Sequence, residues 1–402
     1  MRSGKKLSLH IKEYRGDQAQ ARPRKSRAIF ALNMDVSGGN VTITESGATR
    51  GYGGSVGVGA VHAANVDVSG GNVTIKQSEA AESGGTGEWV VFLVLYSYGT
   101  GGAISAGNMM IVSGGSVSIT ESTAFDGDGG AIDAVNDMNV SGGNVTITKS
   151  QATRGGCIYI EDDFMQSGGA VSLEGCRAIR EGGGIFSSRN ITMGEMATLT
   201  IRDTLADRGG GIMTTWMHNK ARRLHVSNCS ATSHGGCVYV RARAELAAPL
   251  SLSGCIAKGT GGGIYAQGKL VSPQISCTDC HAPTSACFHL ESGEASIESL
   301  ILRSRSLLGP ASPSIIVATG HDAVVTLGTA DCREVPGCAL PVAQMQLARL
   351  LCQRGESRQS LADGTACREC PAGQIRLVAV DKARLCLGSQ SGTVNYNYRV
   401  LS

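Results

Sequence analysis

The residues best suited to chemistry are a group of carboxylates in the middle of the chain. Enzymes that cleave polysaccharides use a pair of such side chains, one as general acid and the other as base or nucleophile. Asp126-Gly-Asp128 also offers the oxygen ligands that Ca²⁺ prefers. The candidate catalytic residues are Asp126, Asp128, Asp133, Asp162 and Asp163, with Asp137 and Glu161 close by in the sequence.

A repeat surrounds these acids and must position them. One of its anchors is Gly-Gly-x-Ile/Val, whose last residue recurs at intervals of 26–28 residues from Ile104 to Ile264. The other is a small residue with Ala two positions later, as in Ser150 and Ala152. Three positions before each small residue stands an inward candidate: Ile43, Ile75, Ile119, Ile147, Leu173, Ile201, Val226, Leu252 and Cys277. Such self-similarity at a fixed period is typical of a solenoid.

Each repeat predicts one coil of a right-handed parallel β-helix. Apolar residues alternate over short runs such as Val145-Thr146-Ile147, which is strand periodicity, and no repeat offers a helical period over ten or more residues. At about 3.3 Å per residue, one repeat suffices for three short strands and three turns. We therefore expect an all-β solenoid of about ten coils of 25–28 residues, each hydrogen-bonded to the next.

The repeat weakens a catalytic interpretation of the acids. Equivalent positions of the other repeats carry no acid, and the sequence pairs no Arg or Lys with these acids at a fixed position. The histidines have no recurring Ser or Asp partner, and the glycines are periodic corners and not a phosphate-binding loop. We predict solvated turn residues, no metal and no cofactor; a polysaccharide lyase or hydrolase stays the alternative.

Composition changes at both ends of the repeats. Residues 1–27 carry nine basic and two acidic residues, a net +7 that leaves −4 for the rest of a chain with an overall charge of +3. We expect residues 1–28 to be a disordered basic tail and residues 29–330 to form the β-helix, with an insertion at 82–100. Residues 331–402 are expected to form a cysteine-rich module. No nucleic-acid partner is expected.

The longest apolar run is Trp89 to Tyr96. It falls short of the ~20 residues that cross a bilayer, so we expect no transmembrane segment in this chain. The N-terminal tail also lacks the apolar core of a signal peptide. Aromatic residues make up 4% of the chain, which leaves few rings for stacking on sugars.

The fourteen cysteines fall into two groups. Six lie in the C-terminal segment, where a short stretch with little core predicts disulfides: Cys332, Cys338, Cys352, Cys367, Cys370 and Cys386. A zinc site built on Cys367-x-x-Cys370 is the alternative, although no second pair follows at zinc spacing. Disulfides indicate an oxidising compartment.

The other eight cysteines lie in the coils. Cys277 and Cys280 occupy repeat positions, so they are interpreted as packed side chains and not as a metal site. Cys229, Cys255 and Cys280 share one repeat position, and stacking about 4.8 Å apart would bring them within disulfide range. One adjacent pair could therefore be bridged, with two partners competing for Cys255.

The sequence also contains acceptor motifs for N-glycosylation. They fit a secreted protein, because such sites are modified on surface segments of the secretory pathway. The candidate sites are Asn40, Asn72, Asn139, Asn144, Asn190 and Asn228.

Two segments resemble known families. The run VSNCSATSHGGCVYV at 226–240 resembles the small-x-Ala…Gly-Gly-Ala-Ile repeat of chlamydial polymorphic outer membrane proteins and related β-helix surface proteins, over roughly residues 30–290. Gly-Gly-Ala-Ile is matched literally at 101–104 and 129–132, whereas the family's Phe-x-x-Asn half is not matched. Cys-Arg-Glu-Cys-Pro-Ala-Gly at 367–373 resembles ephrin-receptor-like cysteine-rich modules. The resemblance implies an adhesin role and an extracellular location.

Regular coils without an acid–base constellation predict a non-catalytic protein. We expect an extracellular or cell-surface adhesin-like binding protein, or a structural repeat protein. Its expected partner is a carbohydrate or a protein on a cell surface or matrix.

Overall fold

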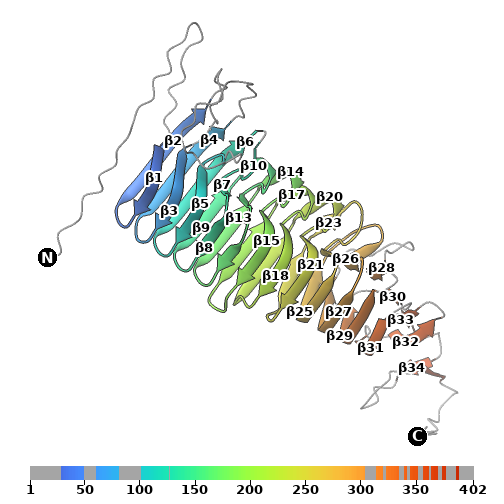
Figure 1. Cartoon of the computed structure of the whole chain (residues 1–402). Coiled ribbons are helices and arrows are strands. Elements are labelled where there is room, and N and C mark those ends of the chain that lie inside the picture. Colours follow the sequence, from blue (N-terminus) through green and yellow to red (C-terminus); the bar gives the residue numbers. More distant parts are fainter. Residues whose placement is uncertain are drawn as a thin grey trace.

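The computed structural model describes the parts of the chain that build the repeats. These are residues 29–48, 60–80, 101–125, 127–303, 314–319, 323–334, 339–341, 345–351, 356–361, 364–369, 374–376 and 386–388. The predicted tail at 1–28, the insertion at 82–100 and Asp126 lie outside the described residues. Within the described ranges all regular elements are strands, and coils stack along one axis from the blue to the orange end of the chain (Figure 1).

Parallel pairing groups the strands into four ladders that run along the stack. The first ladder contains β1 (Ile29–Val36), β3 (Val61–Val68), β5 (Ile104–Val112), β7 (Ile132–Ala134), β11 (Ile158–Ile160), β15 (Ile185–Met193), β18 (Ile212–Asn219), β21 (Val238–Leu246), β24 (Ile264–Ala266), β26 (Ser285–Leu290) and β28 (Ser314–Ala318). The long strands of this set continue onto the second ladder, where β8 (Asp137–Val140) and β12 (Phe164–Gln166) join them.

The third ladder carries the Asn-Val-Thr-Ile segments and their equivalents. It contains β2 (Asn40–Ala48), β4 (Asn72–Ala80), β6 (Ser116–Ala124), β9 (Asn144–Thr148), β13 (Ala170–Glu174), β16 (Thr198–Arg202), β19 (Arg223–Ser227), β22 (Leu250–Ser253), β25 (Lys269–Thr278), β27 (Glu294–Arg303), β29 (Val324–Glu334) and β31 (Met345–Leu351). The fourth ladder contains β10 (Gln151–Arg154), β14 (Arg177–Glu181), β17 (Leu205–Arg208), β20 (Ser230–His234) and β23 (Ile256–Ala257).

Each coil pairs with the next so that equivalent residues lie side by side. Ile119 pairs with Ile147, and Ile147 pairs with Leu173. The predicted inward residues from Ile75 to Leu252 are fully buried, and Cys277 is 3% exposed. The prediction of an all-β parallel β-solenoid is therefore confirmed. Burial of one aliphatic residue on top of another along the stack supplies its core, because no single coil can cover its own apolar side chains.

A column of left-handed residues makes the corner between the third and fourth ladders. Six non-glycine residues there have φ between 51° and 57°, and two glycines have φ of 66° and 60°. They are Gln77, Glu121, Lys149, Gly175, Asp203, Asn228, Gly254 and Asp279, each directly before the small residue of its repeat. L-residues seldom adopt this conformation, so its recurrence in coil after coil shows that stacking imposes the corner.

Three disulfides cross the interior of single coils, which overturns the prediction of a bridge between stacked cysteines. They join Cys157 to Cys176, Cys237 to Cys255 and Cys277 to Cys287. Cys229 and Cys280, the stacked neighbours of Cys255, are free thiols. Side chains at equivalent positions of parallel coils point the same way, whereas the two sulfurs of one coil face each other across its interior.

A sequence signal for two of these bridges exists in the repeat. In each, the third residue of Gly-Gly-x-Ile is Cys, and a second Cys follows 19 or 18 residues later at the small-residue position. Where that third residue is Gly211, the following Cys229 has no opposite sulfur and stays reduced.

We expect Cys229 and Cys280 to resist alkylation in the folded protein. Burial raises the pKa of the Cys229 thiol to about 11 and that of Cys280 to about 12. The thiolate is the reactive species, so both thiols stay protonated and inert at neutral pH. Thiol-trapping mass spectrometry should find them unmodified until the chain is denatured; labelling under native conditions would contradict their burial.

The parallel ladder extends beyond residue 330, at which the sequence predicts the cysteine-rich module to begin. β31 pairs in parallel with β29. Antiparallel strands follow, with β33 (Gly364–Glu369) between β30 (Ala339–Pro341) and β32 (Glu356–Leu361), and β34 (Gln374–Arg376) beside β35 (Cys386–Gly388). Cys332, Cys367 and Cys386 lie on strands, and Cys338, Cys352 and Cys370 fall outside the described residues. The pairing of these six stays a prediction.

Candidate functional site

The predicted acids separate into two places in the structure. Asp162 and Asp163 lie where the first ladder turns onto the second. Asp128 lies at the corner between the fourth and first ladders, and Asp133 lies in β7 of the first ladder. Among the described residues, no hydrogen bond or ion pair joins the two sets into one site. Each set is built from contacts between coils.

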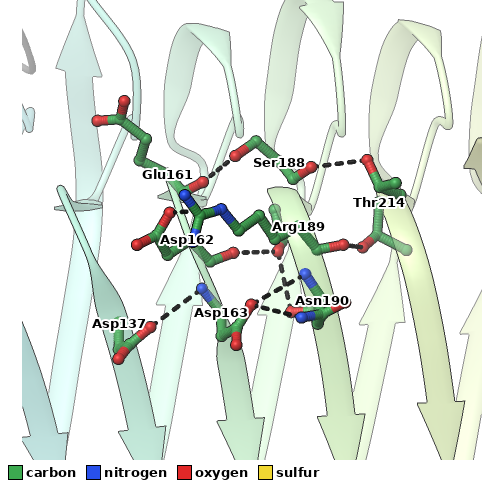
Figure 2. Close-up of polar contacts among 10 residues, drawn as sticks. Asp137, Glu161, Asp162, Asp163, Ser188, Arg189, Asn190 and Thr214 are labelled. Carbon is green, nitrogen blue, oxygen red and sulfur yellow. Dashed lines mark hydrogen bonds and ion pairs between the residues drawn. The ribbon is translucent and has the colours of Figure 1, made fainter.

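Asp163 forms hydrogen bonds to the coil before it and to the coil after it. Its Oδ1 accepts hydrogen bonds from the backbone N of Asn190 at 3.2 Å and from Asn190 Nδ2 at 2.9 Å. The backbone N of Asp163 itself donates to Oδ1 of Asp137 on the preceding coil, at 3.2 Å. Figure 2 shows the three side chains following one another along the stack. The Asp163 carboxylate therefore stabilises the contact between adjacent coils.

Asp162 ends a ladder of asparagines. Asn65, Asn108 and Asn136 each donate from Nδ2 to the Oδ1 of the asparagine one coil before, at 2.8, 2.9 and 2.6 Å. Asp162 occupies the next coil, with its backbone N donating to the Asn136 carbonyl. Arg189 Nε, one coil further, lies 3.0 Å from Asp162 Oδ1 (Figure 2).

The prediction that no Arg or Lys is paired with these acids is wrong, because two ion pairs join them to arginines. Arg189 follows Asp162 after 27 residues, and Arg154 follows Asp128 after 26. Each arginine therefore lies on the coil that follows the coil of its carboxylate. The sequence does not reveal either ion pair, because each occurs once, between two adjacent coils, and does not recur in the other repeats.

The Asp128–Arg154 ion pair lies against aromatic side chains of the first ladder. Arg154 Nε and Nη2 donate to the two Asp128 oxygens at 3.1 and 2.5 Å, which is bidentate geometry. The same guanidinium lies 4.8 Å above the Tyr159 ring and 5.4 Å from that of Phe186. Asp128 is thus neutralised by a residue that also packs on aromatic rings.

Asp133 is fully buried beside this pair. It precedes Tyr159 by one coil in the first ladder, and neither carboxyl oxygen has a hydrogen-bond partner among the described residues. Burial raises the pKa of this carboxyl well above its usual range, and the charges of Asp128 and Glu161 raise it further against the opposing effect of Arg154. The neutral acid is therefore the form that the folded chain accommodates.

Asp133→Asn is expected to change how stability depends on pH. In the folded protein the raised pKa keeps the carboxyl neutral at pH values at which the same group in the unfolded chain, with its ordinary pKa, is ionised. Ionisation therefore favours unfolding, so wild-type stability falls as pH rises from about 4. Melting temperatures from pH 4 to 8 should fall less steeply in Asp133→Asn. Parallel curves would contradict a raised pKa.

An aromatic column that the sequence reasoning missed extends from Asp133 along the first ladder. Its members point outward yet are 0–7% exposed: the aromatic Tyr159, Phe186, Tyr239 and Tyr265, with Met213 between Phe186 and Tyr239. Tyr159 stacks on Phe186 with ring centroids 5.2 Å apart, and Tyr239 stacks on Tyr265 at 4.9 Å. The available signal was the residue after Ile or Val in Gly-Gly-x-Ile/Val, which is large in successive repeats.

Charged residues cover this aromatic column. Glu181 is 8% exposed in its side chain and receives Arg208 Nη2 at 2.7 Å and Arg241 Nη2 at 3.1 Å. Tyr265 donates its hydroxyl to Glu291 at 2.8 Å. Arg208 and Glu291 each contact a residue of the adjacent coil, whereas Arg241 reaches Glu181 from two coils further along the stack. The side chains of the column are 0–7% exposed, so the rings are not accessible to a ligand.

A hollow of about 220 Å³ on the second ladder is an open site in the described part of the chain that the sequence reasoning missed. Three consecutive coils line it, with residues from β15, β18 and β21: Asn190, Ile191, Thr192, Trp216, Met217, His218, Arg243 and Glu245. Trp216 is 52% exposed. Arg243 forms an ion pair with Glu245, whose Oε2 lies 3.8 Å from His218 Nδ1.

The predicted glycosylation sites differ in how their amides are engaged. Asn72 Nδ2 donates to Asn40 Oδ1 at 3.0 Å, and Asn190 Nδ2 donates to Asp163. Asn228 adopts φ of 52° and is exposed, as is Asn144, whereas Asn139 is half-buried. Glycosylation of these residues stays a prediction.

Among the described residues, no group of three or more His, Cys, Asp or Glu side chains is arranged to hold a metal ion. The same part of the chain has no helix of the length and apolarity that spanning a bilayer requires. No protein-family model, curated protein or solved structure matches the chain.

Proposed function

We propose that this chain is a non-catalytic, adhesin-like binding protein of the cell surface or extracellular space. The observation that carries the proposal is the engagement of its acids. Asp162 and Asp163 are occupied by contacts between coils, Asp128 is paired with Arg154, and Asp133 is buried. What the described solenoid offers to a partner is therefore its long outer surface, with the hollow around Trp216 as one feature of it.

The cysteine pattern supports an extracellular location. Three disulfides inside the coils are in keeping with an oxidising compartment, since cytosolic proteins rarely keep structural disulfides. The protein purified from its native source should also carry the six C-terminal cysteines as disulfides. Six free thiols in thiol-trapping mass spectrometry, with the coil disulfides reduced as well, would remove the argument for this location.

A polysaccharide lyase or hydrolase is the second candidate, favoured by one observation. Asp133 has the raised pKa of a general acid and lies near a second carboxyl group, that of Asp128. An enzyme of this kind requires substrate to reach Asp133, which is 0% exposed in the described structure.

A retention-and-release assay separates the two functions. Immobilised polysaccharides, intact cells and matrix proteins are incubated with the full chain, then assayed for bound protein and for newly formed sugar ends. We expect retention on cells or matrix without release. Release that disappears in both Asp133→Asn and Asp128→Asn would replace the binding function by catalysis, and absence of retention on every surface would overturn it.

A further inference from the structure

The hollow on the second ladder presents an indole ring to solvent in an otherwise polar surrounding. Trp216 lies between Asn190 of the preceding coil and Arg243 of the following coil, in one outward column. Thr192, His218 and Glu245 form the parallel column two residues further along the strands. A half-exposed tryptophan is an informative observation, because burial of so large an apolar ring is normally favourable.

The backbone around Trp216 is fixed, so the ring is presented from a rigid surface. Thr214 Oγ1 donates to the Trp216 carbonyl at 3.0 Å and lies 3.2 Å from the carbonyl of Arg189 on the preceding coil. Beneath the outward residues, Ile191 and Met217 are 0% and 2% exposed and belong to the core. A site on a packed sheet loses little conformational entropy when a ligand binds.

The polar groups of the hollow carry little net charge. The positive charge of Arg243 is balanced by Glu245, to which it is paired. Arg243 Nε is buried and has no hydrogen-bond partner among the described residues. Asn190 gives its Nδ2 to Asp163 and keeps Oδ1 as an acceptor. A suitable ligand is therefore neutral, with hydroxyl groups on its edges and an apolar face for the indole.

We propose that this hollow binds one neutral pyranose residue of a glycan. The C–H face of the ring lies on Trp216, while Arg243 Nη1 and Glu245 Oε2, the atoms that their mutual ion pair leaves over, donate to and accept from hydroxyls on the ring edge. The volume of about 220 Å³ is below the ~300–1,000 Å³ of pockets that enclose a drug-sized ligand, which suits a single sugar ring of a longer chain. The inference names a ligand class for the proposed binding function and rests on it.

Sugar could reach the hollow from two sources. One is a glycan on another molecule, and the other is a glycan attached to Asn190 of this chain, since Asn190-Ile191-Thr192 is an acceptor motif. The hydrogen bond from Asn190 Nδ2 to Asp163 favours the first source, because attachment uses the same nitrogen.

The test measures binding of neutral oligosaccharides of glucose, mannose, galactose and xylose to the full chain, with polygalacturonate as the charged comparison. Trp216→Ala should weaken binding about tenfold or more, as expected for loss of a central aromatic contact. Arg243→Lys should also weaken it, because an ammonium lacks the planar arrangement of N–H groups with which a guanidinium can hold Glu245 and donate to a hydroxyl at the same time. Phe125→Ala is the matched control, since Phe125 is 55% exposed elsewhere on the solenoid, and it should bind like wild type.

The outcomes separate this site from the proposed function. Binding that Trp216→Ala leaves intact, with an unchanged melting temperature, overturns the site but not the adhesin-like function. Retention on cells or matrix without binding of any neutral oligosaccharide, in protein from a non-glycosylating host, overturns the sugar ligand. Oligosaccharide binding is also compared between protein that carries a glycan on Asn190 and protein that does not. Binding by the unmodified protein alone would mean that the chain's own glycan occupies the hollow. Binding by unmodified protein together with an unmodified Asn190 in the native protein assigns an external glycan.

Discussion

Gly183→Ala is expected to destabilise the solenoid by about 3 kcal/mol or more, the upper end of overpacking effects. Gly183 is the second glycine of its Gly-Gly-x-Ile repeat and does not adopt a left-handed conformation. A Cβ at this position would lie 2.2 Å from the carbonyl oxygen of Gly210 and 2.7 Å from that of Leu205. Both atoms belong to the backbone of the next coil, so no side-chain movement can relieve the clash.

The same lack of space for a Cβ recurs at the second glycine of the other repeats, so the prediction applies to each of them. Added Cβ atoms at the second glycine of successive repeats would lie 2.1–2.4 Å from the backbone oxygen of the coil that follows. The positions are Gly102, Gly130, Gly156, Gly183, Gly210, Gly236 and Gly262. The backbone of neighbouring coils approaches so closely here that only hydrogen fits between them.

Gly107→Ala is the matched control. Gly107 lies in β5, has no left-handed conformation, and a Cβ there would meet its nearest atoms at 3.8 and 3.9 Å, which is ordinary contact. Its melting temperature in calorimetry should stay close to that of wild type, while that of Gly183→Ala falls by many degrees. Equal melting temperatures for the two variants would refute the close coil-to-coil approach at Gly183.

Ile147→Asp is expected to cost about 4 kcal/mol or more and to break the stack at its coil. Ile147 is 0% exposed and lies between Ile119 and Leu173 of the adjacent coils. The substitution removes buried aliphatic contacts and places a carboxyl where the neighbouring side chains offer no hydrogen bond. Each coil is stabilised by its neighbours, so loss of one coil also weakens the two that pack on it.

Thr146→Asp provides the comparison, because Thr146 precedes Ile147 in β9 and its side chain is exposed. Chemical denaturation of the two variants should give a large loss of stability for Ile147→Asp and a small change for Thr146→Asp. The reverse order would mean that the inward and outward sides of this strand are exchanged.

The period and composition of the repeat were sufficient to predict the solenoid and its inward column. Equivalent residues of parallel coils lie directly above one another, so a spacing of 26–28 residues in sequence becomes a contact in space. The column from Ile75 to Leu252 follows from this rule alone. The left-handed corner at Lys149 and its equivalents was not predicted, because Gln77, Glu121 and Lys149 give no sign of positive φ, although Gly, Asn or Asp, which favour it, stands at the other five positions.

Only the tertiary structure decided which side chains meet across a coil or around a corner. Repeat spacing placed Cys255 near Cys229 and Cys280, but the direction of the side chains joined it to Cys237. Likewise, Asp162 and Asp163 looked like free turn residues until stacking set Arg189 and Asn190 beside them. The hollow at Trp216 depends on six outward residues from three coils, none of which repeats. A periodic sequence determines contacts between equal positions, whereas contacts between unequal positions depend on how each coil turns.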